Sequence, residues 1–223
     1  MARIARVVLP GHPHHITQRG SRRQRTFFCE ADYKTYIRLM AQWTRHHGVE
    51  VWAYCLMPNH VHLIATPGSV DALRQAIGEA HRRYTCMINC RQKWTGYLWQ
   101  GRFHSFAMDE SHLLAAARYI ELNPVKAGLC AHPQEYAWSS ARAHLAGCDD
   151  GLVAVSPLLR RVSDWTAFLS DPLDAEQGDL LESHERTGRP LGNPDFLMAA
   201  EKTIGRTLTK ARPGPKPRHS AIN

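Results

Sequence analysis

A short β-hairpin between two long amphipathic helices constrains the fold of this chain more than any other feature of its sequence. Residues 49–56 alternate between polar and apolar side chains as a strand does, Pro58-Asn59 has the composition of a tight turn, and residues 60–66 return as a second strand. Apolar residues recur at three- and four-residue spacing over 30–47 and again over 69–94, which predicts a helix on each side of the hairpin. We therefore expect an antiparallel sheet covered by helices.

Two further predicted strands complete the order of elements. Residues 12–20 and 97–107 have the pattern of strands, and residues 110–122 have that of a helix ended by Asn123-Pro124. The resulting order is β-α-β-β-α-β followed by a helix. This order predicts an α+β fold, a ferredoxin-like antiparallel sheet with two helices on one face.

The second part of the chain has a different composition. We assign residues 1–147 to the sheet domain, which a short helical segment closes at its end. Residues 148–223 are richer in Asp, Gly and Pro, and we expect a connector with one helix at 157–169. A last helix from residue 193 or 194 to about 209 and a basic tail rich in proline complete this prediction.

Composition excludes a membrane protein. The chain has 223 residues, of which 43% are hydrophobic, so it can bury a core. Its uncharged runs fall short of the roughly 18 apolar residues that a membrane span needs. Pro10 and Gly11 interrupt the apolar start, and none of the six cysteines forms a CxxC pair, so we expect a cytoplasmic protein with reduced thiols rather than a secreted one. A structural zinc site is the alternative for the cysteines.

Charge is distributed unevenly and indicates a nucleic-acid partner. Residues 1–29 carry six arginines and no acid, residues 145–200 carry ten acidic and four basic groups, and residues 201–223 carry six basic groups and one acid. The formal net charge is +8. Arginine-rich ends bind phosphates because each neutralised phosphate releases counterions. A charge that only solubilises the protein is the alternative.

Four residues form the candidate site for chemistry. His60 and His62 lie two apart on a predicted strand, so both imidazoles project from one face and can converge on one metal ion. Tyr119 and Asn123 lie four apart on a predicted helix and share a face; they offer a phenol nucleophile and a hard oxygen ligand. Spacing alone equally allows a structural histidine pair, a core tyrosine and an asparagine that ends a helix.

Five ordered blocks of sequence lie within roughly residues 12–145. The blocks are ITQRG at 16–20, LMPNHVHLI at 56–64, LWQGRF at 98–103, YIELNPVKAGL at 119–129 and WSSA at 138–141. These blocks resemble, in order, the strands, the tyrosine helix and the closing segment of the single-tyrosine HUH transposases, an insertion-sequence transposase-like family. The subgroup that the sequence resembles most is the REP-associated tyrosine transposases, which also carry a C-terminal extension.

The resemblance implies a role for each candidate residue. His60 and His62 would be paired ligands of Mg²⁺ or Mn²⁺, and Asn123 would be the third ligand where small relatives often use glutamine. Tyr119 would attack a phosphodiester in single-stranded DNA and form a 5′-phosphotyrosine. The implied partner is a DNA hairpin of a repetitive extragenic palindrome, which places the protein at the nucleoid as a monomer or homodimer. By helical spacing Asp109, Glu110 and Glu121 do not share the tyrosine face, and we expect them to be surface groups.

The same reading gives candidate contacts to DNA. Trp99, Phe103 and Phe106 are candidates for stacking on bases, with a core position as the alternative. Arginines and lysines in the first loop, the fourth strand and the C-terminal extension are candidates for phosphate contacts. These basic residues are Arg19, Arg22, Arg23, Arg25, Arg102, Arg189, Arg212, Lys216 and Arg218.

Three functions remain open at this stage. The first is an enzyme that cuts and rejoins DNA through Tyr119, which the complete set of four candidate residues favours. The second is a domesticated transposase that binds palindromic DNA without turnover. The third is a phosphodiesterase that hydrolyses DNA through metal-bound water.

Overall fold

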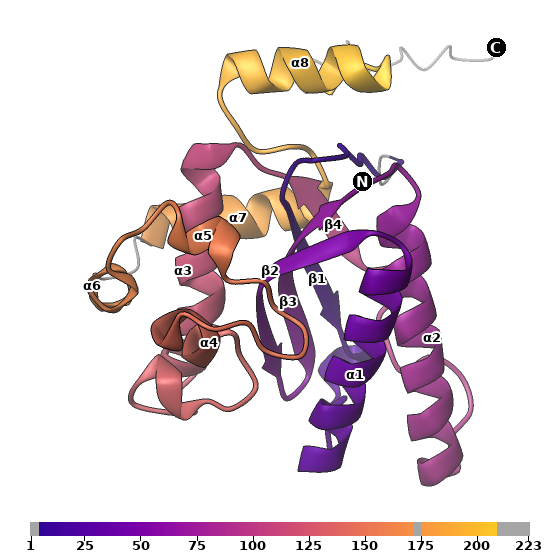
Figure 1. Cartoon of the computed structure of the whole chain (residues 1–223). Coiled ribbons are helices and arrows are strands. Elements are labelled where there is room, and N and C mark those ends of the chain that lie inside the picture. Colours follow the sequence, from indigo (N-terminus) through magenta and orange to yellow (C-terminus); the bar gives the residue numbers. More distant parts are fainter. Residues whose placement is uncertain (1–4, 172–174, 209–223) are drawn as a thin grey trace, which may run out of the picture.

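A computed structural model describes residues 5–171 and 175–208 of the chain. Four strands, eight α-helices and two short 3-10 turns make up this part (Figure 1). The strands are β1 (His14–Arg19), β2 (Val49–Met57), β3 (His60–Pro67) and β4 (His104–Ala107). The helices are α1 (Glu30–His46), α2 (Ala72–Gln92), α3 (Glu110–Lys126), α4 (Ala141–Ala146), α5 (Ser156–Leu159), α6 (Trp165–Ser170), α7 (Ala175–Thr187) and α8 (Pro194–Ile204). The turns are η1 (Ser21–Arg23) and η2 (Pro133–Glu135).

The strands form one antiparallel sheet in the order β2-β3-β1-β4. This order and the helices between the strands are those of the ferredoxin-like α+β fold, so the predicted fold class is confirmed. The register places Thr17 opposite His62 on one side and opposite His104 on the other. Because opposite residues of paired strands project from the same face, one face of the sheet carries several histidines.

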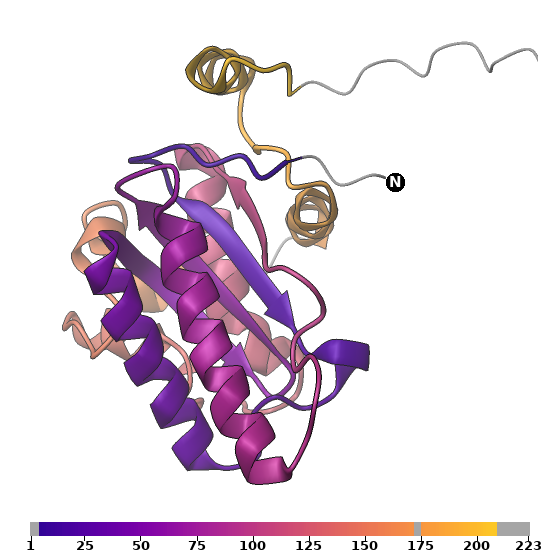
Figure 2. The same cartoon turned by 90° about the vertical axis from the view of Figure 1, so that its right-hand side faces the viewer.

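Different layers cover the two faces of the sheet. Helices α1 and α2 lie side by side on one face, and α3 with the later helices lies on the other (Figures 1 and 2). Ile16 and Leu63 belong to the apolar cluster under α1 and α2, together with the buried rings of Tyr36 and Tyr84. Ile64 and Ile120 belong to a second apolar cluster on the α3 side. Alternation along each strand thus separates two cores.

The fourth strand is shorter than predicted. Only His104–Ala107 pair regularly with β1, whereas the preceding segment makes a single bridge, from Trp99 to Gly20. The three aromatic candidates for base stacking, Trp99, Phe103 and Phe106, are at most 7% exposed and belong to the cores. The alternative of a core position therefore describes them.

Helix α3 is longer than predicted, because Asn123-Pro124 does not end it. The helix continues to Lys126 with Pro124 inside it. A proline in a helix removes the N–H that would bond the carbonyl four residues earlier, here that of Ile120, and its ring crowds that carbonyl; the helix continues only where tertiary packing supports it. Pro124 is buried against such packing. Asn123 therefore lies within the helix, one turn after Tyr119.

The segment after residue 147 packs on the sheet domain. Val153 bridges to Val51 at the edge of the sheet and belongs to the first core, and Trp165, Leu181 and Leu191 belong to the second. Three helices, α5 to α7, occupy the region for which one helix was predicted. Helix α7 was missed because Gly178 and several acids dilute its apolar pattern.

Helix α8 lies apart from the sheet at one end of the molecule (Figure 1). It packs through Ala200, Phe196 and Ile204 on a small third apolar cluster with Val7 and Leu9. The predicted last helix therefore exists but ends at Ile204. Within the ranges that the model describes, no helix is both long enough and apolar enough to cross a membrane.

Candidate active site

The two paired histidines lie at the start of β3, directly after the hairpin turn. The Asn59 side chain accepts a hydrogen bond from Nδ1 of His60 at 2.6 Å, which leaves Nε2 of His60 for another partner. The rings of His60 and His62 have centroids 4.9 Å apart. Gly20 lies against this turn, and any side chain there would clash with the Gln24 carbonyl, because a Cβ would come within 2.3 Å of that oxygen. The predicted pairing of the histidines on one face is therefore what the structure shows.

A third histidine, His15 of β1, orients His62. Nε2 of His15 lies 3.1 Å from Nδ1 of His62, and the two rings stack at 5.4 Å. When His62 donates this bond, its Nε2 carries the lone pair that a metal ligand needs. Sequence analysis missed His15, because its place beside His62 depends on the register of β1 with β3, which puts His15 and Thr17 on the face that carries His62.

Helix α3 brings Tyr119 and Asn123 to the same face of the sheet. Asp109 caps the helix by accepting a hydrogen bond from the His112 backbone N–H, which fixes where the helix begins. Tyr119 is 8% exposed, and its ring centroid lies 5.7 Å from that of His62. The ring of His15 lies 6.3 Å from the tyrosine ring. The predicted tyrosine and histidines therefore meet, although they come from segments far apart in the sequence.

The site opens into a cavity of about 560 Å³. Tyr119 and His62 line it together with side chains of β4 and of the segment before it. Arginines and glutamates line the rest, several of them from α7, so the missed helix supplies one wall. The lining residues are Arg19, Arg23, His62, Gln100, His104, Tyr119, Glu182, Glu185 and Arg186.

Burial sets the protonation states in the site. Burial lowers the pKa of His60 to about 4, with a further contribution from Arg19, and lowers the pKa of His62 well below its usual range. Both imidazoles are therefore neutral near pH 7, as metal ligands must be. Burial also raises the pKa of Tyr119 to about 12; Glu182 and Glu185 add to this rise, and the neighbouring Asn123 amide and Arg19 oppose it.

The polar groups of the site suit a divalent cation. Each paired histidine has Nδ1 engaged by a neighbour, so each can offer Nε2. Nδ2 of Asn123 is buried without a hydrogen-bond partner, as are Nδ1 of His15 and Oγ1 of Thr17. Within the described ranges no three His, Cys, Asp or Glu side chains form a group that could hold a metal ion.

The candidate DNA contacts divide between the site and other surfaces. Arg19 and Arg23 line the site cavity, and Arg22 and Arg25 are exposed beside it in the same loop. Arg102 lines a separate small pocket with Arg6 and Arg186. Arg189 contacts the Leu208 backbone carbonyl instead of the site. Arg212, Lys216 and Arg218 lie outside the described residues.

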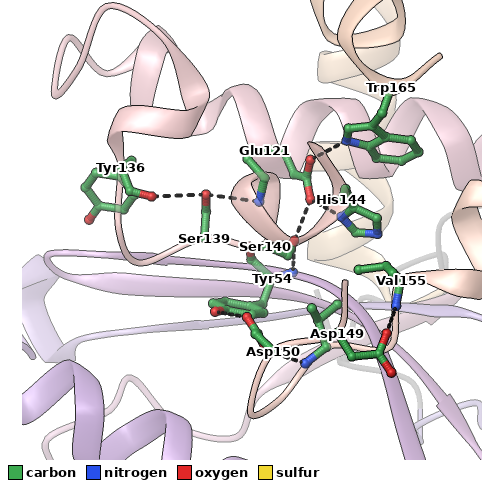
Figure 3. A network of polar contacts seen from close by, with 12 residues as sticks. Tyr54, Glu121, Tyr136, Ser139, Ser140, His144, Asp149, Asp150, Val155 and Trp165 are labelled. Atoms are coloured by element: carbon green, nitrogen blue, oxygen red, sulfur yellow. Dashed lines mark hydrogen bonds and ion pairs between the residues drawn. The ribbon is translucent and has the colours of Figure 1, made fainter. Parts of the chain in front are cut away.

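Glu121 is a buried structural group, and its prediction as a surface group is wrong. Its carboxylate is fully buried and accepts hydrogen bonds from Ser140 at 2.5 Å, from Nδ1 of His144 at 2.7 Å and from the Trp165 indole at 2.9 Å (Figure 3). Ser140 in turn accepts a bond from the Tyr54 backbone N–H at 2.9 Å. These bonds fix the outer side of α3 to β2, α4 and α6.

The other two predicted surface carboxylates differ from each other. Glu110 is exposed and pairs with Arg161, as expected for a surface group. Asp109 is half-buried and accepts bonds from the backbone N–H groups of His112 and Asn193, so it caps α3 and holds the segment before α8. The surface prediction is therefore wrong for Asp109 as well.

Comparison with protein families gives the class of the chain. The model of the family described as IS200-like transposases matches residues 11–123, which run from just before β1 through Asn123. This match covers half of the sequence, and the chain belongs to this family. The expected family is thus confirmed. A search of curated proteins finds no match.

Two solved structures resemble this chain. A structure described as a REP-associated tyrosine transposase bound to a REP hairpin is 21% identical, with a TM-score of 0.54, over 69% of this chain and 92% of the other. A crystal structure of a candidate transposase from Deinococcus radiodurans R1 is also 21% identical, with a TM-score of 0.39, over 54% of this chain and 96% of the other. The first comparison shows a shared fold.

Proposed function

We propose that this transposase-family chain cuts and rejoins single-stranded DNA at hairpins, with Tyr119 as the nucleophile. The observation that carries the proposal is the meeting of Tyr119 with His15 and His62, next to His60, beside a cavity that Tyr119 and His62 line together with Arg19 and Arg23. A phenol beside neutral imidazoles and arginines suits attack on a phosphodiester. The solved neighbour bound to a REP hairpin supports a hairpin of a repetitive extragenic palindrome as the substrate class.

The reaction would proceed in two steps, cleavage and rejoining. The Tyr119 oxygen attacks the phosphorus as its proton passes to solvent, the bond from phosphorus to the 3′-oxygen breaks, and that oxygen takes up a proton. The products are a 5′-phosphotyrosine and a free 3′-hydroxyl. A 3′-hydroxyl of another strand end then attacks the phosphotyrosine, a new phosphodiester forms and the phenol is released. The protein–DNA bond preserves the energy of the phosphodiester for rejoining.

The residues of this chain would each contribute a defined part. His60, His62 and Asn123 would hold Mg²⁺ or Mn²⁺, which supplies a Lewis acid for the non-bridging phosphate oxygens. His15 holds the ring of His62 in place, and Arg19 favours the phenolate by lowering the pKa of Tyr119. Arg23 at the cavity wall is placed to meet a backbone phosphate.

The test uses a labelled single-stranded oligonucleotide with a palindromic hairpin from beside the coding region. We expect cleavage and an SDS-resistant protein–DNA adduct with Mg²⁺ or Mn²⁺, both lost on addition of a chelator and in Tyr119→Phe. Tyr136→Phe is the matched control, since that half-buried tyrosine bonds the Leu56 carbonyl outside the site. Hairpin binding with neither product indicates a palindrome-binding protein without turnover. Cleavage that survives in Tyr119→Phe indicates hydrolysis through water.

A further inference from the structure

The exposed aromatic side chains of the described residues gather at one place, beside the site. Phe28 is 37% exposed, Trp94 42% and Tyr97 87%. Trp94 packs edge-on against Phe28 with ring centroids 5.7 Å apart. The remaining exposed large hydrophobic residues within the described ranges are aliphatic. A cluster of exposed aromatic rings indicates a binding surface, whereas single hydrophobic side chains scattered over a protein surface do not.

Basic residues surround these rings. Arg22, Arg23 and Lys93 are exposed, and the Arg91 guanidinium lies 5.9 Å from the centre of the Phe28 ring. The nearby carboxylate of Asp32 is buried and already paired with Arg91 at 2.5 Å, so it does not cancel the exposed cations. Aromatic rings among cations fit a ligand that carries both flat bases and phosphates.

The backbone of the same surface is strained. Three non-glycine residues of the described chain have positive φ angles, and all three are basic residues of this surface: Arg22 at 54°, Arg23 at 62° and Lys93 at 56°. Residues with a side chain rarely adopt this conformation. Lys93 caps the end of α2, where this conformation is common. Arg22 and Arg23 lie in the loop beside the site, and strain of this kind concentrates at binding sites.

This surface is continuous with the cavity of Tyr119. The segment between α2 and β4 runs beside η1 (Figure 2), where the Ser21 N–H bonds the Leu98 carbonyl at 2.8 Å. Gln100 bonds the Arg19 carbonyl at 2.8 Å through its own backbone N–H. Gln100 and Arg23 line the cavity itself, so the segment that carries Trp94 and Tyr97 reaches the cavity at Gln100.

We propose that Phe28, Trp94 and Tyr97 form a stacking surface for unpaired bases that flank the hairpin, with Arg22, Arg23 and Lys93 along the backbone phosphates. This inference rests on the proposed function, since it assigns a path to the single strand that enters the Tyr119 cavity. Paired bases of the stem are not available for stacking, whereas flanking bases expose their faces. The surface therefore distinguishes a hairpin with a single-stranded foot from a blunt one.

The experiment measures binding by fluorescence anisotropy without divalent metal, so that cleavage does not interfere. Three probes are compared: a blunt hairpin, the same hairpin with ten unpaired thymidines on either side of its foot, and the thymidine strand alone. For the variant with both Trp94→Ala and Tyr97→Ala, we expect a Kd about 10- to 100-fold higher for the two probes with unpaired bases, and an unchanged Kd for the blunt hairpin. Substitution Trp94→Phe is expected to keep most of the binding.

The matched control combines Val70→Ala and Met198→Ala, which remove exposed aliphatic surface elsewhere. An unchanged Kd in the Trp94/Tyr97 variant would overturn the proposal, as would an equal loss for blunt and extended hairpins. Circular dichroism checks that the variant is folded. Base-dependent binding by a protein that never cleaves would keep the stacking surface and overturn the catalytic proposal instead.

Discussion

Helix α3 separates two buried polar clusters that are built in opposite ways. On its outer side, both oxygens of the Glu121 carboxylate have partners, from Ser140, His144 and Trp165. On the side facing the sheet, polar atoms of His15, Thr17 and Asn123 are buried without a partner. The two clusters are only two residues apart along the helix at Tyr119 and Glu121.

The difference teaches how a site can be recognised before its ligand is known. A buried polar group without a partner is unfavourable, so most such groups in folded proteins are paired. The Glu121 carboxylate follows this rule and acts as an anchor, although Nε2 of its partner His144 is buried without a partner of its own. The cluster around Tyr119 departs from it at several atoms at once, next to a cavity. This pattern is expected where substrate or a metal ion completes the bonding.

The substitution with the largest expected effect on the Tyr119 cluster is His62→Ala. Loss of a metal ligand removes several kcal/mol of transition-state stabilisation, so we expect the cleavage rate to fall about a thousandfold. The free energy of unfolding should change by much less than the activation free energy of cleavage, because the site is not needed for the core. Single-turnover cleavage and thermal unfolding measure the two effects. The control is His46→Ala, which replaces an exposed histidine of α1. A large activity loss in this control would show that the effect is not specific to His62.

Glu121→Ala should show the opposite balance. The substitution leaves the Ser140 hydroxyl, the His144 ring and the Trp165 indole buried without their acceptor, so we expect a loss of about 3–5 kcal/mol in the free energy of unfolding. Denaturant unfolding measures it. Glu110→Ala breaks only an exposed ion pair with Arg161 and should cost under about 1 kcal/mol. Equal losses in the two variants would contradict the role of Glu121 as an anchor.

His15→Phe tests the orientation of His62. The phenyl ring keeps the volume but leaves Nδ1 of His62 without its partner, and groups in this position typically contribute 10- to 100-fold to activity or metal affinity. We expect a reduction of about that size in cleavage rate, which higher metal concentration partly restores. His81→Phe is the matched control, since His81 is an equally buried histidine bonded to Tyr36 on the other face of the sheet. Normal cleavage by His15→Phe would show that His62 needs no partner.

The smallest effect concerns the pKa of Tyr119. If the phenolate is the reacting form, its raised pKa makes the cleavage rate increase with pH up to about pH 12. Glu185→Gln removes a negative charge that adds to this rise, so the pKa falls and the rate at pH 8 should increase about threefold. A pH–rate profile measures the shift. Asp179→Asn on the same helix lies outside the cavity lining and should leave the profile unchanged.

Much of the fold followed from local pattern. Helices α1 and α2 are amphipathic, and their periodicity depends only on which face each buries. The strands β2 and β3 are buried on both faces, and the Pro58-Asn59 turn marks the hairpin that they form. The candidate residues His60, His62, Tyr119 and Asn123 came from spacing and from family resemblance. The structure brings the tyrosine and the histidines together, and their chemical roles remain predictions.

The parts that sequence analysis missed depend on tertiary contacts. Glu121 faces α4 and α6, whose positions no local pattern reveals, so its polarity suggested the surface. Pro124 continues the helix because it is buried in tertiary packing. His15 becomes meaningful only when β1 is paired in register with β3. Helix α7 carries few apolar residues, and its place against the site depends on Leu181 and Leu191 reaching the second core.

The wall that α7 gives to the cavity has a consequence for the timing of synthesis. Glu182, Glu185 and Arg186 line the cavity, although the sheet and the tyrosine helix are complete by residue 126. A ribosome must therefore translate a further 60 codons, at 5–20 residues per second roughly 3–12 s of elongation, before the cavity can close. A nascent or prematurely terminated chain carries the tyrosine without the finished pocket. The cavity lining is in this way incomplete until Arg186 has been translated.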